Sequence, residues 1–180
     1  MIIRQAGQGD ADALARIYGH HVLHGLGTFE EEPPGAAEMG RRLAAIAALG
    51  LPYLVAEDDG VLGFAYAAPF RPRTAYRYTV EDSVYVAPRA QGRGIGKALL
   101  AAVIDHCQAL GLRQMMAVIG DSDNAASIGV HAALGFEAAG VCRAVGFKQG
   151  RWLDTVWMQR TLNEGGATLP TQAGLKLGGG

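Results

Sequence analysis

The chain has 180 residues, 49% of them hydrophobic, and a formal net charge of −1 at pH 7. This length predicts one domain with a sizeable core. The near-neutral charge argues against a nucleic-acid partner and against an anionic-membrane surface. No apolar stretch approaches a membrane span, and the N-terminus lacks the layout of a secretion signal. The two cysteines, Cys107 and Cys142, are too isolated for a disulfide framework, so the expected location is cytoplasmic.

Hydrophobic periodicity predicts elements in the order β-α-α-β-β-β-α-β-α-β-β. The expected strands cover residues 1–6, 53–57, 61–68, 76–86, 114–119, 136–141 and 152–162. Helices are expected after Asp10, after the loop 24–35, after a glycine-rich turn near residue 94, and over 124–134. Asp10 is expected to cap the first helix, and Asp58-Asp59-Gly60 is typical of a hairpin turn. This order predicts an α/β fold with a mixed sheet.

The glycine-rich turn lies between an expected strand and an expected helix. Gly92, Gly94 and Gly96 remove the side chains that would keep a ligand from the backbone. The first amides of the following helix lack intrahelical partners and can receive a phosphate. Arg89, Arg93 and Lys97 add positive charge at the same place. The turn therefore predicts a pyrophosphate-binding site.

Two common phosphate-binding patterns do not fit this turn. A nucleoside-triphosphate loop requires Ser or Thr after Gly-Lys, but Ala98 follows Lys97. A dinucleotide fingerprint requires a third glycine where Lys97 stands. The remaining pattern is Gln91-x-x-Gly94-x-Gly96.

This pattern resembles that of the GCN5-related N-acetyltransferases (GNAT), in which the turn holds the pyrophosphate of acetyl-coenzyme A. A second segment, Asn124 to Phe136, resembles the family's second cofactor helix, with His131 at the usual tyrosine position. The phosphinothricin and methionine-sulfoximine acetyltransferase subgroup is similar there and at residues 79–86, 117–120 and 146–154. The resemblance covers about residues 1–162.

The resemblance implies the GNAT fold, with a mixed, mostly antiparallel central sheet of six to seven strands flanked by about four helices. Residues 1–162 are expected to form this single domain. The glycine-rich composition after Leu162 predicts a flexible tail over residues 163–180. Because members of the subgroup pair, a homodimer is expected.

Acetyl-CoA is the implied acetyl donor, and the family chemistry uses no metal. His20 and His24 have the spacing of paired metal ligands, but no third ligand is apparent, so these histidines and His21 are expected to be bystanders. The main chain of Val84 and Val86 is expected to pair with the amides of the carrier arm. The expected cofactor-binding residues are Val84, Tyr85, Val86, Gln91, Gly92, Arg93, Gly94, Ile95, Gly96, Lys97, Asn124 and Ser127.

Glu81 is the expected general base, because an attacking amine must be neutral and a carboxylate can accept its proton. The resemblance implies the same role. His131 is the second catalytic candidate, either to protonate the departing thiolate or to position the substrate. Asp82 is a weaker candidate on the opposite face of the strand. A structural carboxylate and a structural histidine are the alternatives.

The resemblance places the acceptor pocket at Phe29, Glu30, Arg71, Arg73 and Tyr76. Guanidinium groups there are suited to bind a substrate carboxylate, although solvated loop charges are the alternative.

The resemblance thus implies transfer of acetyl to the α-amino group of a small amino-acid-like acceptor, and the transfer is expected to be direct because neither cysteine has the setting of a nucleophile. Phosphinothricin, methionine sulfoximine and methionine sulfone are the implied acceptors, and detoxification is the implied role. Two alternatives remain open, namely an acetyltransferase of peptide or protein N-termini and a non-catalytic acyl-CoA-binding sensor.

Overall fold

The computed structural model describes residues 1–177, so the end of the expected tail, Gly178 to Gly180, lies outside the described residues. A seven-stranded sheet has the order β1-β2-β3-β4-β5-β7-β6. Its strands are β1 Ile2–Gln5, β2 Tyr53–Glu57, β3 Val61–Pro69, β4 Thr79–Val86, β5 Gln114–Gly120, β6 Glu137–Lys148 and β7 Arg151–Thr161. The α-helices of the described residues are α1 Ala11–His24, α2 Ala36–Ala48, α3 Ile95–Ala109 and α4 Ala125–Ala132. Only β4 and β5 pair in parallel, which confirms the expected mixed, mostly antiparallel sheet.

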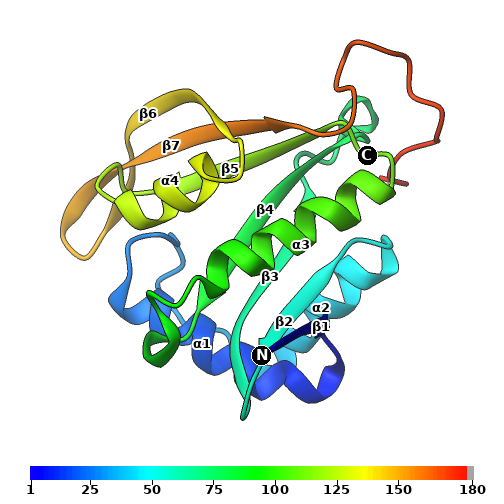
Figure 1. Cartoon of the computed structure of the whole chain (residues 1–180). Coiled ribbons are helices and arrows are strands. Elements are labelled where there is room, and N and C mark those ends of the chain that lie inside the picture. Colours follow the sequence, from blue (N-terminus) through cyan, green and yellow to red (C-terminus); the bar gives the residue numbers. More distant parts are fainter. Residues whose placement is uncertain (178–180) are drawn as a thin grey trace.

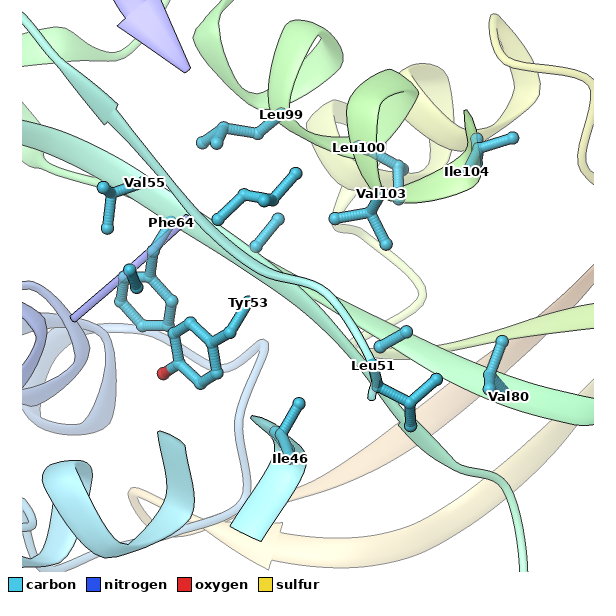
Figure 2. Packing of buried hydrophobic residues seen from close by; sticks show 14 of the residues in the cluster. Ile46, Leu51, Tyr53, Val55, Phe64, Val80, Leu99, Leu100, Val103 and Ile104 are labelled. Carbon is cyan, nitrogen blue, oxygen red and sulfur yellow. The ribbon is translucent and has the colours of Figure 1, made fainter. Parts of the chain in front are cut away.

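Helices pack on both faces of the sheet (Figure 1). Leu99 and Val103 lie one helical turn apart on α3 and are fully buried against one face. Figure 2 shows them on the opposite side of the strands from Ile46 of α2, with Tyr53 projecting toward the α2 side. Among the helices of residues 1–177, none combines the length and the apolar character that a membrane crossing requires.

β4 and β5 form a fork. They pair only from Thr79 with Gln114 to Glu81 with Met116. Beyond that point β4 continues beside β3, and β5 continues beside β7. The two strands spread apart in Figure 1. The fork leaves main-chain groups of both strands without a strand partner, and a ligand can bind to such groups.

The strand boundaries differ from the predicted ones where the backbone is irregular. The strand expected from residue 76 begins at Thr79, because Thr74–Tyr76 forms a 3-10 turn. β6 extends to Lys148 rather than to residue 141. Shifts of register between Ala138 and Gly140, and again before Gly146, interrupt the alternating pattern that marks a strand in the sequence.

Asp10 has a different role from the predicted helix cap. Its carboxylate accepts hydrogen bonds from Arg4 at 2.9 Å and from the amide of Gly7 at 2.8 Å. It makes no side-chain cap to α1. The predicted hairpin turn is confirmed, since Asp59 and Gly60 have positive φ angles between β2 and β3.

The segment after β7 packs on the domain, in contrast to the expected flexible tail. Leu175 is 8% exposed, and its amide donates to Arg77 O at 2.8 Å. The Tyr78 hydroxyl donates to Gln172 O at 2.6 Å. One buried leucine and these main-chain contacts thus anchor a segment whose average composition predicted no burial. The domain boundary at residue 162 stays a prediction.

Candidate active site

A cavity of about 830 Å³ follows the fork between β4 and β5. Its walls are the end of α1 and the loop after it, the second half of β4, the glycine-rich turn, the middle of β5 and the start of α4. The expected cofactor-binding residues that line it are Val84, Tyr85, Val86, Gln91, Gly92, Gly94, Ile95, Gly96, Lys97, Asn124 and Ser127. Arg93 alone of the expected set is absent from this lining.

The glycine-rich turn presents open backbone at one end of the cavity. Gly92 and Gly94 have φ angles of +73° and +76°, and a Cβ added at either position would meet nothing within 4 Å. The first intrahelical bond of α3 runs from Ala98 N to Gly94 O, so the preceding amides have no helical acceptor. Within residues 1–177, Arg93 and Lys97 form no ion pair. Free amides beside two cations fit a diphosphate.

Hydrogen bonding along β4 decides which main-chain groups face the fork. Thr79 O accepts from Phe70 N, and Ala87 N donates to Leu62 O, so the odd-numbered residues of β4 bond to β3. The even-numbered residues 84 and 86 therefore turn their amides and carbonyls toward the fork. This is the orientation that pairing with a carrier arm requires.

His21 already uses one of these groups. Its Nε2 lies 2.9 Å from Val86 O, and because a carbonyl only accepts, Nε2 carries the proton. Burial lowers the pKa of His21, in agreement with a neutral ring. His21, expected to be a bystander, lines the cavity and fixes the end of β4. The Val84 groups and the Val86 amide remain without a strand partner.

Asn124 caps α4 at the edge of the cavity. Its Oδ1 accepts from Ser127 N at 3.2 Å, so Asn124 is the N-cap of α4. Its Nδ2 lies 3.5 Å from Gly120 O at the end of β5. The side chains of Asn124 and Ser127 line the cavity, so the start of α4 faces the space expected to hold the carrier arm.

His131 is buried at the other end of α4, with 3% of its surface exposed. Its Nδ1 lies 2.7 Å from Ser127 O, and its Nε2 lies 3.0 Å from Asp82 Oδ2. Since the carbonyl only accepts, Nδ1 carries a proton, and a further proton is shared between Nε2 and the carboxylate. Burial disfavours the charged ring, but the hydrogen bond and the charge of Asp82 outweigh burial and raise the pKa of His131.

The Asp82 side chain is also buried, with 1% of it exposed, and its Oδ1 has no hydrogen-bond partner among the described residues. Asp82 follows Glu81, the last residue of β4 that pairs with β5. The Asp82–His131 pair therefore connects β4 to α4 across the fork. Because both ring nitrogens are engaged, His131 offers no free N–H to a departing thiolate in this arrangement.

Glu81 is half-buried on the opposite face of β4 from Asp82, because side chains alternate along a strand. Tyr85 lies four residues after Glu81 on β4, so its side chain projects to the same face of the strand. Tyr85 packs edge-on against Tyr18 of α1, which shows that this face is covered by α1. Burial raises the pKa of Glu81, and the charge of Arg71 only partly offsets this rise. A carboxylate of raised pKa at the closed end of the fork is suited to accept a proton.

Arg71 and Tyr76 lie together in the connection between β3 and β4. The guanidinium carbon of Arg71 is 4.3 Å from the centre of the Phe70 ring and 5.6 Å from that of Trp157. The Tyr76 ring packs edge-on against Phe70 at 5.6 Å. Neither Arg71 nor Arg73 pairs with a carboxylate in the part of the chain described. Trp157 was not predicted, because only the pairing of β5 with β7 brings it to this cluster.

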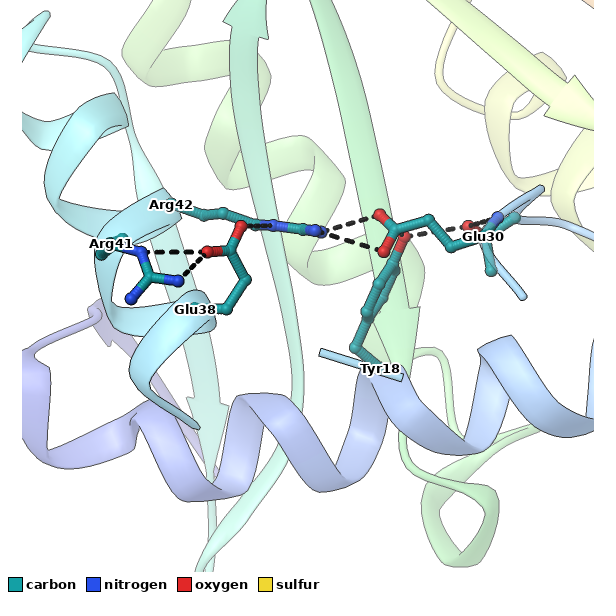
Figure 3. A network of polar contacts seen from close by, with 6 residues as sticks. Tyr18, Glu30, Glu38, Arg41 and Arg42 are labelled. Atoms are coloured by element: carbon teal, nitrogen blue, oxygen red, sulfur yellow. Dashed lines mark hydrogen bonds and ion pairs between the residues drawn. The ribbon is translucent and has the colours of Figure 1, made fainter. Parts of the chain in front are cut away.

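Glu30 belongs to a network of polar side chains between the loop, α1 and α2 (Figure 3). Its Oε1 accepts from Arg42 at 2.7 Å and from the Tyr18 hydroxyl at 2.8 Å, and its Oε2 accepts from Arg42 at 3.2 Å. Arg42 also donates to Glu38. Both carboxylate oxygens of Glu30 thus have protein partners, and its contact with an acceptor stays a prediction.

The expected site consists of two groups of residues. The cofactor group lines the cavity, as described above. Of the two catalytic candidates, His131 lines the cavity. The expected residues outside that lining are Phe29, Glu30, Arg71, Arg73, Tyr76, Glu81 and Arg93. The closed end of the fork lies between the cofactor-binding residues and the acceptor-pocket residues. There the side chains of Glu81 and Asp82 project to opposite faces of β4.

The sequence model of the acetyltransferase (GNAT) domain matches residues 3–157. The chain therefore belongs to the GNAT acetyltransferase family. It is an N-acetyltransferase, and acetyl-CoA is its acetyl donor. The open amides at Gly92 and Gly94 and the free main chain at Val84 fit this donor, and they are the residues that would hold its diphosphate and its arm.

Particular relatives are close in sequence and structure. The chain is 54% identical over 169 residues to a phosphinothricin N-acetyltransferase of Alcaligenes faecalis, which covers 93% of this chain and 86% of that protein. It is 42% identical to an L-methionine sulfoximine/L-methionine sulfone acetyltransferase of Salmonella typhimurium, with 91% and 96% covered. A phosphinothricin acetyltransferase from Sinorhizobium meliloti, crystallised with acetyl-CoA, has a TM-score of 0.93 and 51% identity, with 96% and 94% covered.

Proposed function

We propose that this acetyltransferase acts on the α-amino group of a small amino-acid-like acceptor of the phosphinothricin, methionine sulfoximine or methionine sulfone type. The names of the relatives support this acceptor class. The observation that carries the proposal is the half-buried carboxylate of Glu81 at the closed end of the fork, within the electrostatic influence of Arg71. A carboxylate and a cation are complementary to the ammonium and carboxylate groups of an amino acid.

The proposed reaction is a direct transfer. The amides of the glycine-rich turn hold the diphosphate, and the main chain of Val84 holds the carrier arm. Glu81 accepts the ammonium proton, directly or through a water, and the neutral nitrogen attacks the thioester carbonyl. Strand amides near Val84 stabilise the oxyanion. Its collapse breaks the C–S bond, and the departing thiolate takes up the proton that the attacking nitrogen loses. His131 acts by position, because with Asp82 it holds α4 against β4.

Thiol release from acetyl-CoA tests this proposal. The acceptors are phosphinothricin, L-methionine sulfoximine, L-methionine sulfone and a short peptide with a free N-terminus. Release that depends on the amino acids, together with an N-acetylated product, is the expected result. Release with the peptide alone would favour an N-terminal acetyltransferase. Binding of acetyl-CoA without any release would favour a sensor.

A homodimer is the second part of the proposal. β6 is an edge strand of the sheet, and it exposes Val141, Val145 and Phe147 by 45%, 58% and 57%, with Trp152 of β7 exposed by 67%. Exposed apolar side chains on an edge strand are typical of a contact surface. Light scattering should give the mass of two chains, and the double variant Phe147→Glu/Trp152→Glu should give one. A wild-type monomer would contradict the pairing.

Detoxification in the cytoplasm is the third part. Expression of the chain in bacteria should raise their tolerance of phosphinothricin, and Glu81→Gln should not. Equal tolerance with the two proteins would contradict a protective acetylation.

A further inference from the structure

Lys148 is a buried cation that the proposed reaction does not use. It ends β6 with 3% of its surface exposed, and no carboxylate of residues 1–177 pairs with it. Its ammonium donates to Gly25 O at 3.0 Å and to Thr28 O at 2.8 Å. Burial lowers its pKa, and the charges of Glu31 and Glu30 oppose this. An ammonium buried against carbonyls is unfavourable unless those bonds are well formed, so Lys148 and these two carbonyls constrain each other.

The two carbonyls belong to the loop between α1 and α2. Gly25 and Thr28 line the acetyl-CoA cavity, and Phe29 and Glu30 follow directly in the expected wall of the acceptor pocket. Lys148 is separated from the two carbonyls by 123 and 120 residues. It therefore holds a distant loop against the sheet.

A second contact holds the same loop. A Cβ built at Gly120 would lie 2.6 Å from Leu26 O and 3.0 Å from Phe29 Cε1, and one built at Gly146 would overlap the Phe29 ring. Glycine at both positions lets the loop lie directly on β5 and β6. Gly146 and Lys148 are two residues apart on β6, so the Phe29 ring and the ammonium meet the same stretch of strand.

The other side of the loop is bonded to the helices. Thr28 Oγ1 lies 2.9 Å from the Tyr18 hydroxyl, and Glu30 pairs with Arg42. The segment from Gly25 to Glu30 is thus held between α1 and α2 on one side and β6 on the other. Among these contacts, the Lys148 ammonium is the one that bonds the loop main chain at two points.

We propose that Lys148 is a positioning residue for the acceptor. It fixes the segment from Gly25 to Glu30 in the conformation that forms one wall of the acceptor pocket, and it touches neither the acceptor nor acetyl-CoA. The effect on the acceptor rests on the proposed function, whereas the effect on the loop is independent of any reaction.

Lys148→Met tests the inference, because methionine fills similar space and lacks the ammonium. The KM for phosphinothricin should rise about tenfold, the loss expected when a charged donor no longer holds the loop, while the KM for acetyl-CoA stays within about twofold. Lys148→Arg, which retains a cation, should recover most of the loss. Amide hydrogen exchange in residues 25–30 should accelerate in Lys148→Met.

Gln149→Ala is the matched control, since its side chain bonds Leu23 O at 3.1 Å but not the loop main chain. Its acceptor KM and its exchange in residues 25–30 should equal those of the wild type. Unchanged KM and unchanged exchange in folded Lys148→Met would overturn the inference. If Lys148→Met does not fold, Lys148→Gln, which removes the charge and shortens the side chain but keeps a polar end, decides by the same two readouts. If the wild type acetylates no amino acid, the proposed function fails, and the exchange measurement alone decides the role of Lys148.

Discussion

The imidazole of His131 lies 3.0 Å from the carboxylate of Asp82, and both side chains are buried at the point where β4 and β5 separate. Ser127 O fixes a proton on the other ring nitrogen, so the pair shares one proton and is neutral as a unit. A buried pair of this kind is strongly destabilised when one partner is removed. The pair therefore ties the position of α4 to that of β4.

Asp82→Asn should lower the free energy of unfolding at about pH 6 by about 3 kcal/mol, because it leaves His131 without a partner for its charge. The pKa of His131 is raised from 6.5, so its stabilisation is complete below pH 6.5 and is lost as the pH rises through the pKa of the folded state. In urea unfolding, the free energy of unfolding of the wild type should fall as the pH rises through this range, and that of Asp82→Asn should fall less. Asp105→Asn, on the exposed side of α3, is the control. If the free energy of unfolding of Asp82→Asn depended on pH as that of the wild type does, Asp82 and His131 would not share a proton.

Glu81→Gln should lower kcat by about a hundredfold, because the attacking amine loses its proton acceptor. Burial raises the pKa of Glu81 above 4.5, so the wild-type rate should rise with pH through an acid limb above that value. The variant should lack this limb. Steady-state kinetics across pH measure both effects, with Glu137→Gln on the exposed side of β6 as the control. Normal turnover of Glu81→Gln at every pH would exclude Glu81 as the base.

Gly94→Ala and Gly50→Ala form a matched pair. Their φ angles are +76° and +72°, and neither new Cβ would meet an atom within 4 Å. Both should lose about 1 kcal/mol of stability through backbone strain. Only Gly94 lies at the cavity, so only Gly94→Ala should weaken acetyl-CoA binding, by about tenfold in Kd, as measured by calorimetry. Equal affinities of the two variants would place the diphosphate elsewhere.

Leu175→Ala should destabilise the domain by about 2 kcal/mol, because it removes a buried side chain. Leu169 lies in the same segment but is 88% exposed, whereas Leu175 is 8% exposed. Leu169→Ala should therefore change the free energy of unfolding by less than about 0.5 kcal/mol. Chemical denaturation compares the two variants. If neither substitution changed the free energy of unfolding, the segment after β7 would be detached from the domain in solution.

The features that the sequence predicted correctly depend on neighbouring residues. The hairpin at Asp59 and Gly60 and the open turn at Gly94 each have a signal within a few positions. The orientation of the Val84 main chain toward the fork also follows from the order of the strands, which the family resemblance implied.

Contacts between segments far apart in the chain could not be predicted from the sequence. His21 and Val86 are 65 residues apart, and Lys148 and Thr28 are 120 residues apart. Such pairs depend on strand register, and the irregularities in β6 shift that register in a way that composition does not reveal. The burial of Leu175 was missed for a related reason, since a single anchoring side chain outweighed a glycine-rich average.

The fate of the acetyl group tests the account most directly. Acetyl-CoA labelled with ¹³C in the acetyl carbonyl, incubated with the chain and phosphinothricin, should give N-acetylphosphinothricin in equal amount to the thiol released. Thiol release at the same rate without the acceptor, or no labelled product from any of the amino acids named above, would contradict it.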